Sequence, residues 1–222
     1  MPNTDLIVAN TPKSNNIQKV LHKTASKELA IREKSGYNSD YINHFTIAET
    51  KLIGSYLKER DRLLIYLLVD GCLRVSEAIK VKPCDIKRAD PPFTGWQVKV
   101  YGKGKKYRYV AVSASLITIL YAYIGKSQIK SEELVFPISR VQVWRIMKAG
   151  MDKAGISKPP RVGRVHALRH LGAIEKLEKT GNLGAVQRQL GHSTPTMTMH
   201  YATTIQTKND IETLGKVDNQ WE

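Results

Sequence analysis

The stretch HALRHLGAIEKLEKTGNLGAVQRQLGHSTPTMTMHY, residues 166–201, shows most clearly how this chain folds. Its first half carries apolar residues at helical spacing, namely Leu168, Leu171, Ile174 and Leu177. This spacing predicts an amphipathic helix that stops at Gly181. Asn182 can cap a second, shorter helix over residues 183–190, which Gly191 ends. This end of the chain is therefore expected to be helical.

His192 follows the end of the second helix, and Tyr201 comes nine residues later. Ser193 or Thr194 can cap a third helix with Pro195 at its first position, where the missing N–H costs nothing. Tyr201 then lies about two turns into that helix. A lone His and a lone Tyr on either side of a helix start are the first candidates for chemistry.

The middle of the chain also begins with helical patterns. Residues 45–71, FTIAETKLIGSYLKERDRLLIYLLVDG, predict two helices, and Thr46 and Glu49 have the spacing of a capping box at the first of them. A third helical segment, RVSEAIKV at residues 74–81, ends before Pro83.

A switch from helical to alternating periodicity predicts a β-hairpin. Its first strand puts three apolar residues on one face: Trp96, Val98 and Val100. GKGKK at 102–106 joins it to a return strand at 107–112, and helical patterns resume at 116–124 and 141–154. The expected fold class is thus mainly α with one small antiparallel β-sheet (α+β), without internal repeats.

The composition of the chain changes near residue 44. Residues 1–43 are polar, with one loosely amphipathic stretch from Ile17 to Ile31 that is either a helix or an arm that orders on a partner. The remaining 44–222 are long enough for one domain with its own core. We therefore expect a short N-terminal arm and a single domain.

The charge favours a nucleic-acid partner. Lys and Arg number 35 against 20 Asp and Glu, a formal net charge of +15. The alternative, an acidic membrane surface, is weaker because the longest apolar run, residues 63–73, is broken by Asp70 and is shorter than the ~20 residues needed to cross a bilayer. The start shows no secretory signal, and Cys72 and Cys84 need not be paired, which fits a reducing cytoplasm.

The residue types exclude several kinds of chemistry. No acidic cluster suits a metal, and although His166 and His170 could face a zinc ion, Ala167 stands where a zinc protease has Glu. The hairpin tip GKGKKY lacks the Ser or Thr of a Walker A loop, and Tyr107 stands where a dinucleotide fingerprint needs Gly. We expect neither a metal nor a cofactor.

Cations and neutral donors suited to a phosphate are present instead: Arg74, Lys103, His166, Arg169 and His192. His166 and Arg169 are three residues apart near a helix start, where backbone N–H groups also favour an anion. A guanidinium can grip two phosphate oxygens, and two of them can stabilise a pentacoordinate phosphate without metal. Each residue alone also fits an ordinary role, since Arg74 can simply pair with Glu77 one turn on.

Four stretches follow one another in order: GCLRVSEAIKVKPCDI (71–86), VYGKGKKYRYVAV (100–112), HALRH (166–170) and LGHSTPTMTMHY (190–201). Each alone is a weak signal, whereas all four in order, with consistent secondary structure around each, are a strong one. Together they resemble the boxes of the tyrosine recombinases, the phage-integrase family, and the match runs from about Phe45 to Thr204.

The resemblance implies the catalytic fold of DNA breaking-rejoining enzymes and a catalytic set of Arg74, Lys103, His166, Arg169, His192 and Tyr201. Tyr201 would attack a DNA phosphodiester and leave a 3′-phosphotyrosine link and a free 5′-hydroxyl, without ATP or metal. Lys103 would protonate the departing oxygen, and His166 would help to remove the phenolic proton. Glu77 would orient Arg74.

The resemblance also implies partners. Double-stranded DNA would be the substrate, and basic residues beside the boxes are candidates for DNA contacts: Lys105, Lys106, Arg108, Arg140, Arg145, Arg161 and Arg164. Four protomers would act together, with residues 203–222 docking onto a neighbour. The function would be site-specific recombination, as in mobile genetic elements; integration, excision, resolution and inversion stay open.

Residues 1–43 are too few for the N-terminal domain with which most family members clamp the DNA. Residues 44–222 would then be the catalytic domain of either a minimal recombinase or a longer one. Two other functions stay open. One is a type IB topoisomerase, which relaxes supercoils with the same chemistry, and the other is a DNA-binding regulator that has the fold without the activity.

Overall fold

The computed structural model describes residues 12–34, 44–92, 94–102, 107–160, 162–194, 196, 198 and 199. This part of the chain is mainly helical with one three-stranded antiparallel sheet, which confirms the predicted fold class. The helices are α1 (Pro12–Lys34), α2 (Ile47–Ser55), α3 (Glu59–Asp70), α4 (Val75–Ala78), α5 (Ala114–Lys126), α6 (Arg140–Ala154), α7 (Arg164–Thr180) and α8 (Leu183–Leu190). The strands are β1 (Ile86–Arg88), β2 (Trp96–Tyr101) and β3 (Tyr107–Val112).

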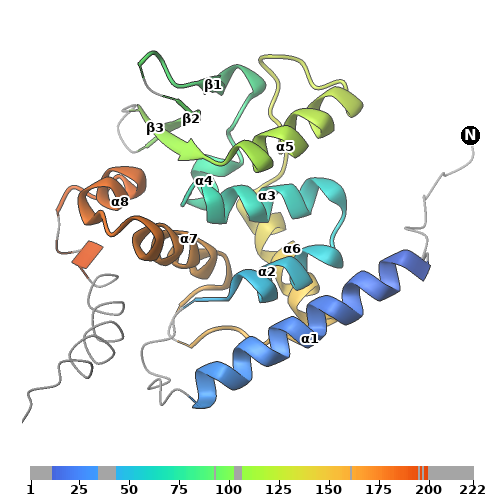
Figure 1. Cartoon of the computed structure of the whole chain (residues 1–222). Helices are drawn as coiled ribbons and strands as arrows, with labels where there is room; N and C mark the ends of the chain where they lie inside the picture. Colours follow the sequence, from blue (N-terminus) through green and yellow to red (C-terminus); the bar gives the residue numbers. More distant parts are fainter. Residues whose placement is uncertain are drawn as a thin grey trace, which may run out of the picture.

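Helix α3 runs through the middle of the molecule, with the sheet and α5 on one side of it and α7, α2 and α6 around the rest (Figure 1). Helix α1 lies along the outside and packs on α2. It is longer than the amphipathic stretch at residues 17–31 suggested, and Ala25 is buried while His22 Nε2 lies 3.0 Å from the Tyr56 hydroxyl. Whether residues 1–43 act as a separate arm stays a prediction.

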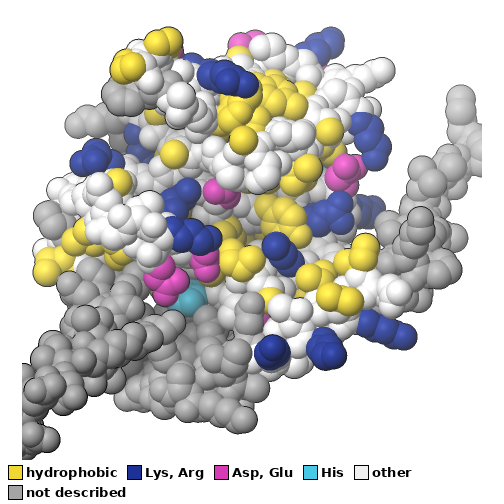
Figure 2. Space-filling model, in the orientation of Figure 1, with side chains coloured by type: hydrophobic (Ala, Val, Ile, Leu, Met, Phe, Trp, Pro, Cys, Tyr) yellow, Lys and Arg dark blue, Asp and Glu magenta, His cyan; other side chains and the backbone are white. Residues whose placement is uncertain are grey.

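The Lys and Arg side chains are distributed over the surface and do not form a single cluster on the face shown in Figure 2. Figure 2 shows Lys and Arg side chains spread over one face, including the described middle part of α1, with exposed hydrophobic side chains between them. No described helix is long and apolar enough to cross a membrane. The charge pattern of this face alone therefore does not single out one surface for binding nucleic acid.

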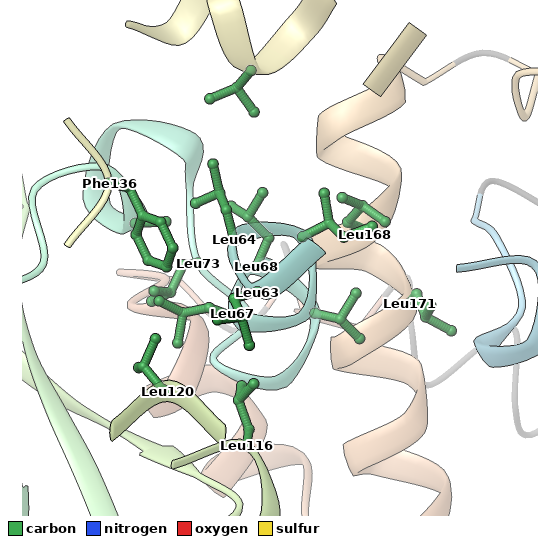
Figure 3. Packing of buried hydrophobic residues seen from close by; sticks show 14 of the residues in the cluster. Leu63, Leu64, Leu67, Leu68, Leu73, Leu116, Leu120, Phe136, Leu168 and Leu171 are labelled. Carbon is green, nitrogen blue, oxygen red and sulfur yellow. The ribbon is translucent and has the colours of Figure 1, made fainter. Parts of the chain in front are cut away.

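The core is built around α3, whose sequence is apolar on nearly every side. Leu64, Leu67 and Leu68 are fully buried, as expected for a helix that is surrounded by other elements. Figure 3 shows leucines of α5 and α7 and the ring of Phe136 packed around this helix. Most of the apolar run at residues 63–73 therefore lies on a core helix, α3, which ends at Asp70.

The sheet has the order β1-β2-β3, with β2 paired antiparallel to both neighbours. The predicted hairpin is present, with Tyr101 opposite Tyr107 at its last described pair. Strand β1 was missed by the sequence analysis because three residues are too few to show alternation. Val98, Val100 and other inward residues of β2 and β3 are buried, while the opposite face carries exposed tyrosines.

The caps predicted at Thr46, Asn182 and Gly191 are present, whereas the helical segment expected over residues 74–81 is a helix only over Val75–Ala78. The Thr46 hydroxyl accepts a hydrogen bond from the Glu49 N–H (2.9 Å), and the Glu49 carboxylate accepts from the Thr46 N–H (2.7 Å), which completes the capping box. Asn182 caps α8, and the residue that ends α8, Gly191, is in the left-handed region with φ 66°. Of the third predicted helix, only residues 196, 198 and 199 are described, and they are helical.

Helix α7 approaches the end of α3 very closely, and this contact positions the functional site. A Cβ on Gly172 would lie 1.9 Å from the Val69 carbonyl oxygen, so only glycine allows the two helices to pack at this distance. The approach brings the middle of α7, at Arg169 and Gly172, against the turn at Cys72 that precedes α4. The next turn of chain carries Arg74 at the N-cap of α4.

Candidate active site

Arg74 stands at the N-terminus of α4, with 42% of its side chain exposed. Its backbone N–H donates to Glu77 Oε2 (2.8 Å), and its Nη1 donates to Glu77 Oε1 (3.2 Å). The pairing that the sequence suggested is present. The guanidinium is therefore held on one side by Glu77 and is open to solvent on the other.

Glu77 is buried and is surrounded by arginines from three elements. Arg108 of β3 donates to both of its oxygens, at 2.8 and 3.1 Å, and Arg169 of α7 lies 3.8 Å away. Burial would raise the pKa of this carboxyl, but hydrogen bonds from Arg108 and from the Arg74 backbone outweigh it and leave its pKa below the ordinary value. Glu77 is therefore ionised, and its charge is shared by three cations.

Arg169 is buried, with only 2% of the residue exposed. Nη1 donates to the Cys72 carbonyl and Nη2 to the Leu190 carbonyl, each at 2.7 Å. A buried charge requires partners of this kind. Arg169 thereby joins α7 to the turn before Arg74 and to the end of α8.

His192 lies next to Arg169, just after the end of α8. Its Nε2 is 3.3 Å from Arg169 Nη2, and its Nδ1 is 3.0 Å from the Thr198 hydroxyl. Burial, then the positive charges of Arg169 and Arg74, lower the pKa of His192 to about 4. The imidazole is therefore neutral at pH 7, and Thr198, which is fully buried, holds its far side.

His166 stands exposed in the first turn of α7 and contacts the ring of His170 edge to face, with centroids 4.7 Å apart. Partial burial, then Arg169 and Arg74, lower the pKa of His166 below its ordinary value. A neutral imidazole that is open to solvent can accept a proton. The geometry suits the role of base that the family resemblance implied.

Two open depressions meet at Arg74. The larger measures about 680 Å³ and includes Glu77, Tyr101, Arg108 and Ser193 in its lining. The smaller, about 380 Å³, is lined by residues of α6 and the start of α7, among them Arg140, Trp144, Arg164 and His166. A strand of DNA that passes over Arg74 would have room on both sides of it.

The smaller depression holds two of the predicted DNA-binding residues, Arg140 and Arg164. The Arg164 guanidinium lies over the ring of Trp144, 5.2 Å from its centroid, and its buried Nε has no hydrogen-bond partner in the described part of the chain. Trp144, half exposed, was not singled out from the sequence. Arg145 is exposed on α6 nearby in sequence.

Several predicted residues lie outside the described part of the structure: Lys103, Lys105, Lys106, Arg161 and Tyr201. Their roles stay predictions. Arg108, predicted to bind DNA, directs its donors to Glu77 and the Gln189 carbonyl instead of pointing only to solvent. In the described ranges no group of three His, Cys, Asp or Glu residues is placed to hold a metal ion.

Sequence reasoning missed Thr198 and Gln189. The Gln189 side chain accepts from the Ala111 N–H (2.9 Å) and donates to the Ala111 and Gly71 carbonyls (2.9 and 3.1 Å). It thus binds the free edge of β3 to α8 and to the end of α3. A Gln at a buried position of an amphipathic helix is the only signal that could have pointed to it.

Comparison with known proteins places this geometry in a family. A family model described as the phage integrase family matches residues 40–207. Tyrosine recombinase XerA of Thermococcus onnurineus is 34% identical over 172 residues, which cover 73% of this chain and 56% of that protein. Tyrosine recombinase XerD of Staphylococcus saprophyticus is 32% identical over 70% of this chain and 54% of its own length. The chain spans about half the length of these relatives.

Solved structures show the same fold. A XerH site-specific recombinase bound to a palindromic difH substrate, in a post-cleavage complex, superposes with a TM-score of 0.64 at 22% identity, over 79% of this chain and 53% of that one. The catalytic domain of bacteriophage HP1 integrase superposes with a TM-score of 0.57 at 19% identity and covers 82% of this chain and 99% of that domain.

Proposed function

Because this chain belongs to the phage integrase family, we propose that it is a site-specific DNA recombinase that cuts and rejoins strands through a phosphotyrosine intermediate. The observation that carries the proposal is that Arg74 and Arg169 both lie against the buried carboxylate of Glu77 and that His192 lies beside Arg169, although the three come from separate parts of the sequence. Such a cluster of donors, with one open guanidinium, suits the non-bridging oxygens of a phosphodiester.

In the proposed reaction the Tyr201 oxygen attacks the scissile phosphorus. A bond forms between this oxygen and phosphorus, the bond from phosphorus to the 5′-oxygen breaks, and the 5′-oxygen leaves with a proton from Lys103. The phosphodiester is exchanged for a phosphotyrosine ester, so its energy is kept for rejoining. Attack by a 5′-hydroxyl then reverses the step and releases the tyrosine.

The electrostatics of the site support this chemistry. A phenol with a pKa of about 10 is a weak nucleophile at pH 7, so a base or nearby cations must favour its ionised form. His166 is neutral, since its pKa is lowered, and is exposed beside Arg74. We therefore propose that His166 takes that proton.

The guanidinium groups of Arg74 and Arg169 would stabilise the negative charge that develops on the phosphate, and other residues already hold both groups in position. Glu77 holds Arg74, and two backbone carbonyls hold Arg169. Donors that need no reorganisation during the reaction contribute the most to transition-state stabilisation. We expect Arg74 to contact the phosphate first because it is the more exposed of the two.

We propose that double-stranded DNA binds across both depressions beside Arg74. Helix α6 supplies Arg140 and Arg145, and Arg164 with Trp144 forms a cationic and aromatic surface next to His166. Contacts of this kind to the DNA backbone position the protein but carry little sequence information. Among the structures with the same fold is XerH site-specific recombinase bound to its difH substrate.

We further propose that the recombinase acts as a homotetramer whose protomers are linked by residues 203–222. In sequence this segment places apolar residues at roughly helical spacing, at Ile211, Leu214, Val217 and Trp221. Deleting residues 203–222 should leave single-strand cleavage intact and reduce strand exchange between two DNA molecules. Unchanged exchange would reject this linkage without affecting the proposal for cleavage.

The test of the main proposal uses a nicked DNA substrate whose released fragment diffuses away, so that the covalent adduct accumulates. The wild-type protein should form the adduct, and Tyr201→Phe should form none while it binds DNA with almost unchanged salt dependence. Tyr121→Phe is the matched control, because the Tyr121 hydroxyl contacts the Ile86 carbonyl away from the site.

An adduct that persists in Tyr201→Phe would show that another residue is the nucleophile. Relaxation of supercoiled DNA by monomers, without recombinant products, would indicate topoisomerase activity instead. If the wild-type protein binds DNA but forms no adduct, the remaining function is that of a DNA-binding regulator without catalytic activity.

A further inference from the structure

The closest ion pair of the candidate site is made by Arg108, which the family resemblance does not place in the catalytic set. From β3 its Nη1 donates to Glu77 Oε1 at 2.8 Å and its Nη2 to Glu77 Oε2 at 3.1 Å. The pair is well shielded, with 18% of the Arg108 side chain and 3% of that of Glu77 exposed. By comparison Arg74 makes one side-chain contact to Glu77, at 3.2 Å, and is 42% exposed.

We infer that Arg108 is a positioning residue for DNA cleavage, which locks Glu77 so that Glu77 can aim Arg74 at the scissile phosphate. This inference rests on the proposed function and assigns Arg108 a role other than DNA contact. A two-point guanidinium–carboxylate pair fixes orientation as well as distance. Glu77 in turn accepts hydrogen bonds from both the backbone N–H and the side chain of Arg74. The orientation of Glu77 therefore sets the orientation of the Arg74 guanidinium, which would face the phosphate.

Glu77 needs such a partner because it is a buried charge. The charged groups that face it are Arg74 from its own helix, Arg108 from β3 and Arg169 from α7. Arg169 is 3.8 Å away and is engaged with two carbonyls, so it contributes less directly. Burial tends to raise the pKa of Glu77, and the hydrogen bonds from Arg108 are the strongest effect that lowers it.

Arg108 also connects the site to the two neighbouring motifs. Its Nε donates to the Gln189 carbonyl at 3.2 Å, near the end of α8 and three residues before His192. Arg108 is the second residue of β3, which begins at Tyr107, and it lies five residues after Lys103 in the sequence. Together with the amide of Gln189 on Ala111, this contact fixes the base of the lysine hairpin against α8.

Gly191 provides independent support for the role of this side chain. A Cβ there would lie 2.9 Å from Arg108 Nε, 3.0 Å from its Cδ and 3.1 Å from its Cζ. The backbone of Gly191 is also in the left-handed region, with φ 66°. The glycine before His192 therefore ends α8 and at the same time leaves room for the Arg108 guanidinium to pass to Glu77.

The experiment compares Arg108→Met with Arg60→Met, which removes an equal charge from an arginine that pairs with Asp61 at the far end of α3. Single-turnover cleavage of the nicked substrate and the salt dependence of DNA binding are measured for both. Arg108→Met should cleave about 100-fold more slowly, the cost of a misplaced catalytic group. Its binding should keep the salt slope of the wild-type protein, whereas loss of a phosphate contact would reduce that slope by about 1.

The pH profile separates positioning from loss of folding. Without Arg108 the pKa of Glu77 rises, so cleavage by Arg108→Met, relative to the wild type, should recover partly as the pH is raised and a larger fraction of Glu77 ionises. Arg108→Lys keeps the positive charge but cannot make the two-point contact of a guanidinium with the carboxylate. Its cleavage rate should therefore lie between those of Arg108→Met and the wild type. Thermal unfolding of each variant shows whether the protein is folded at the assay temperature.

Three results would overturn the inference: cleavage by Arg108→Met at the wild-type rate, a reduced salt slope that accounts for the loss, or a loss that is equal at every pH. Each of them leaves the proposed function standing, because the wild type would still form the adduct. Failure of the wild type to form an adduct would reject the proposed function itself.

Discussion

The imidazole Nε2 of His192 lies 3.3 Å from Nη2 of Arg169, so in this structure it accepts a hydrogen bond. A guanidinium has only donors, which leaves the ring proton on Nδ1, where it faces the Thr198 hydroxyl at 3.0 Å. To donate to a phosphate oxygen, His192 must carry its proton on Nε2 instead. A hydroxyl can donate as well as accept, so Thr198 can support both tautomers.

Thr198→Val should therefore slow cleavage while the fold is kept. Thr198 is fully buried and Val has nearly the same shape, so the change removes chiefly the hydroxyl that faces His192. We expect a loss of roughly tenfold in the single-turnover cleavage rate, the effect of one ordinary hydrogen bond. Thr118→Val, on the exposed side of α5, is the matched control. A wild-type rate for Thr198→Val would mean that the hydroxyl does not select the tautomer.

Gly172→Ala should destabilise the fold by about 3 kcal/mol, because its Cβ would overlap the Val69 carbonyl and force α7 away from α3. The free energy of unfolding from urea titration measures this effect. Gly184→Ala in α8 is the control, since its nearest neighbours are 3.6 Å from the new Cβ, and it should be neutral or slightly stabilising. Equal stability of the two variants would contradict the close packing of α7.

The stability of the protein should fall as the pH is lowered from 6.5 towards about 4. Burial, then the charges of His166 and other neighbours, lower the pKa of His170 to about 4 in the folded state, against an ordinary value of 6.5. Between these values the unfolded chain binds more protons than the folded one, so acid favours unfolding. His170→Phe should reduce this dependence in urea titrations at several pH values. An unchanged slope in the variant would assign the acid sensitivity to other groups.

Lys103→Ala should lose about 100- to 10,000-fold in cleavage of ordinary DNA, the range for loss of a general acid. A substrate with sulfur in place of the bridging 5′-oxygen has a leaving group that needs no proton, and it should restore most of the rate. Lys99→Ala is the control from the same hairpin, since Lys99 packs over the Tyr107 ring. A variant that is equally slow on both substrates would show that Lys103 acts by some means other than proton donation.

Much of the helical framework could be read from the sequence because its signals are local. The Thr46–Glu49 capping box, the Asn182 cap and Gly191 each act within one or two turns, and their predicted positions agree with the structure. Strand β1 could not be predicted, since a three-residue strand is recognised only by its partner, with Ile86 opposite Val98. The order of the motifs likewise indicated the family before any contact was known.

The sequence by itself determined which residue types are available for phosphate chemistry and in what order they occur, because periodicity, caps and motifs are properties of short segments. Tertiary structure alone decided which of them meet. Arg108 and Glu77 are 31 residues apart, and Arg169 and Cys72 are 97 apart, yet each pair is within hydrogen-bond distance. Burial makes these contacts necessary, because a charged group that is removed from water is stable only when hydrogen-bond or ionic partners surround it, and the fold supplies those partners from distant parts of the sequence.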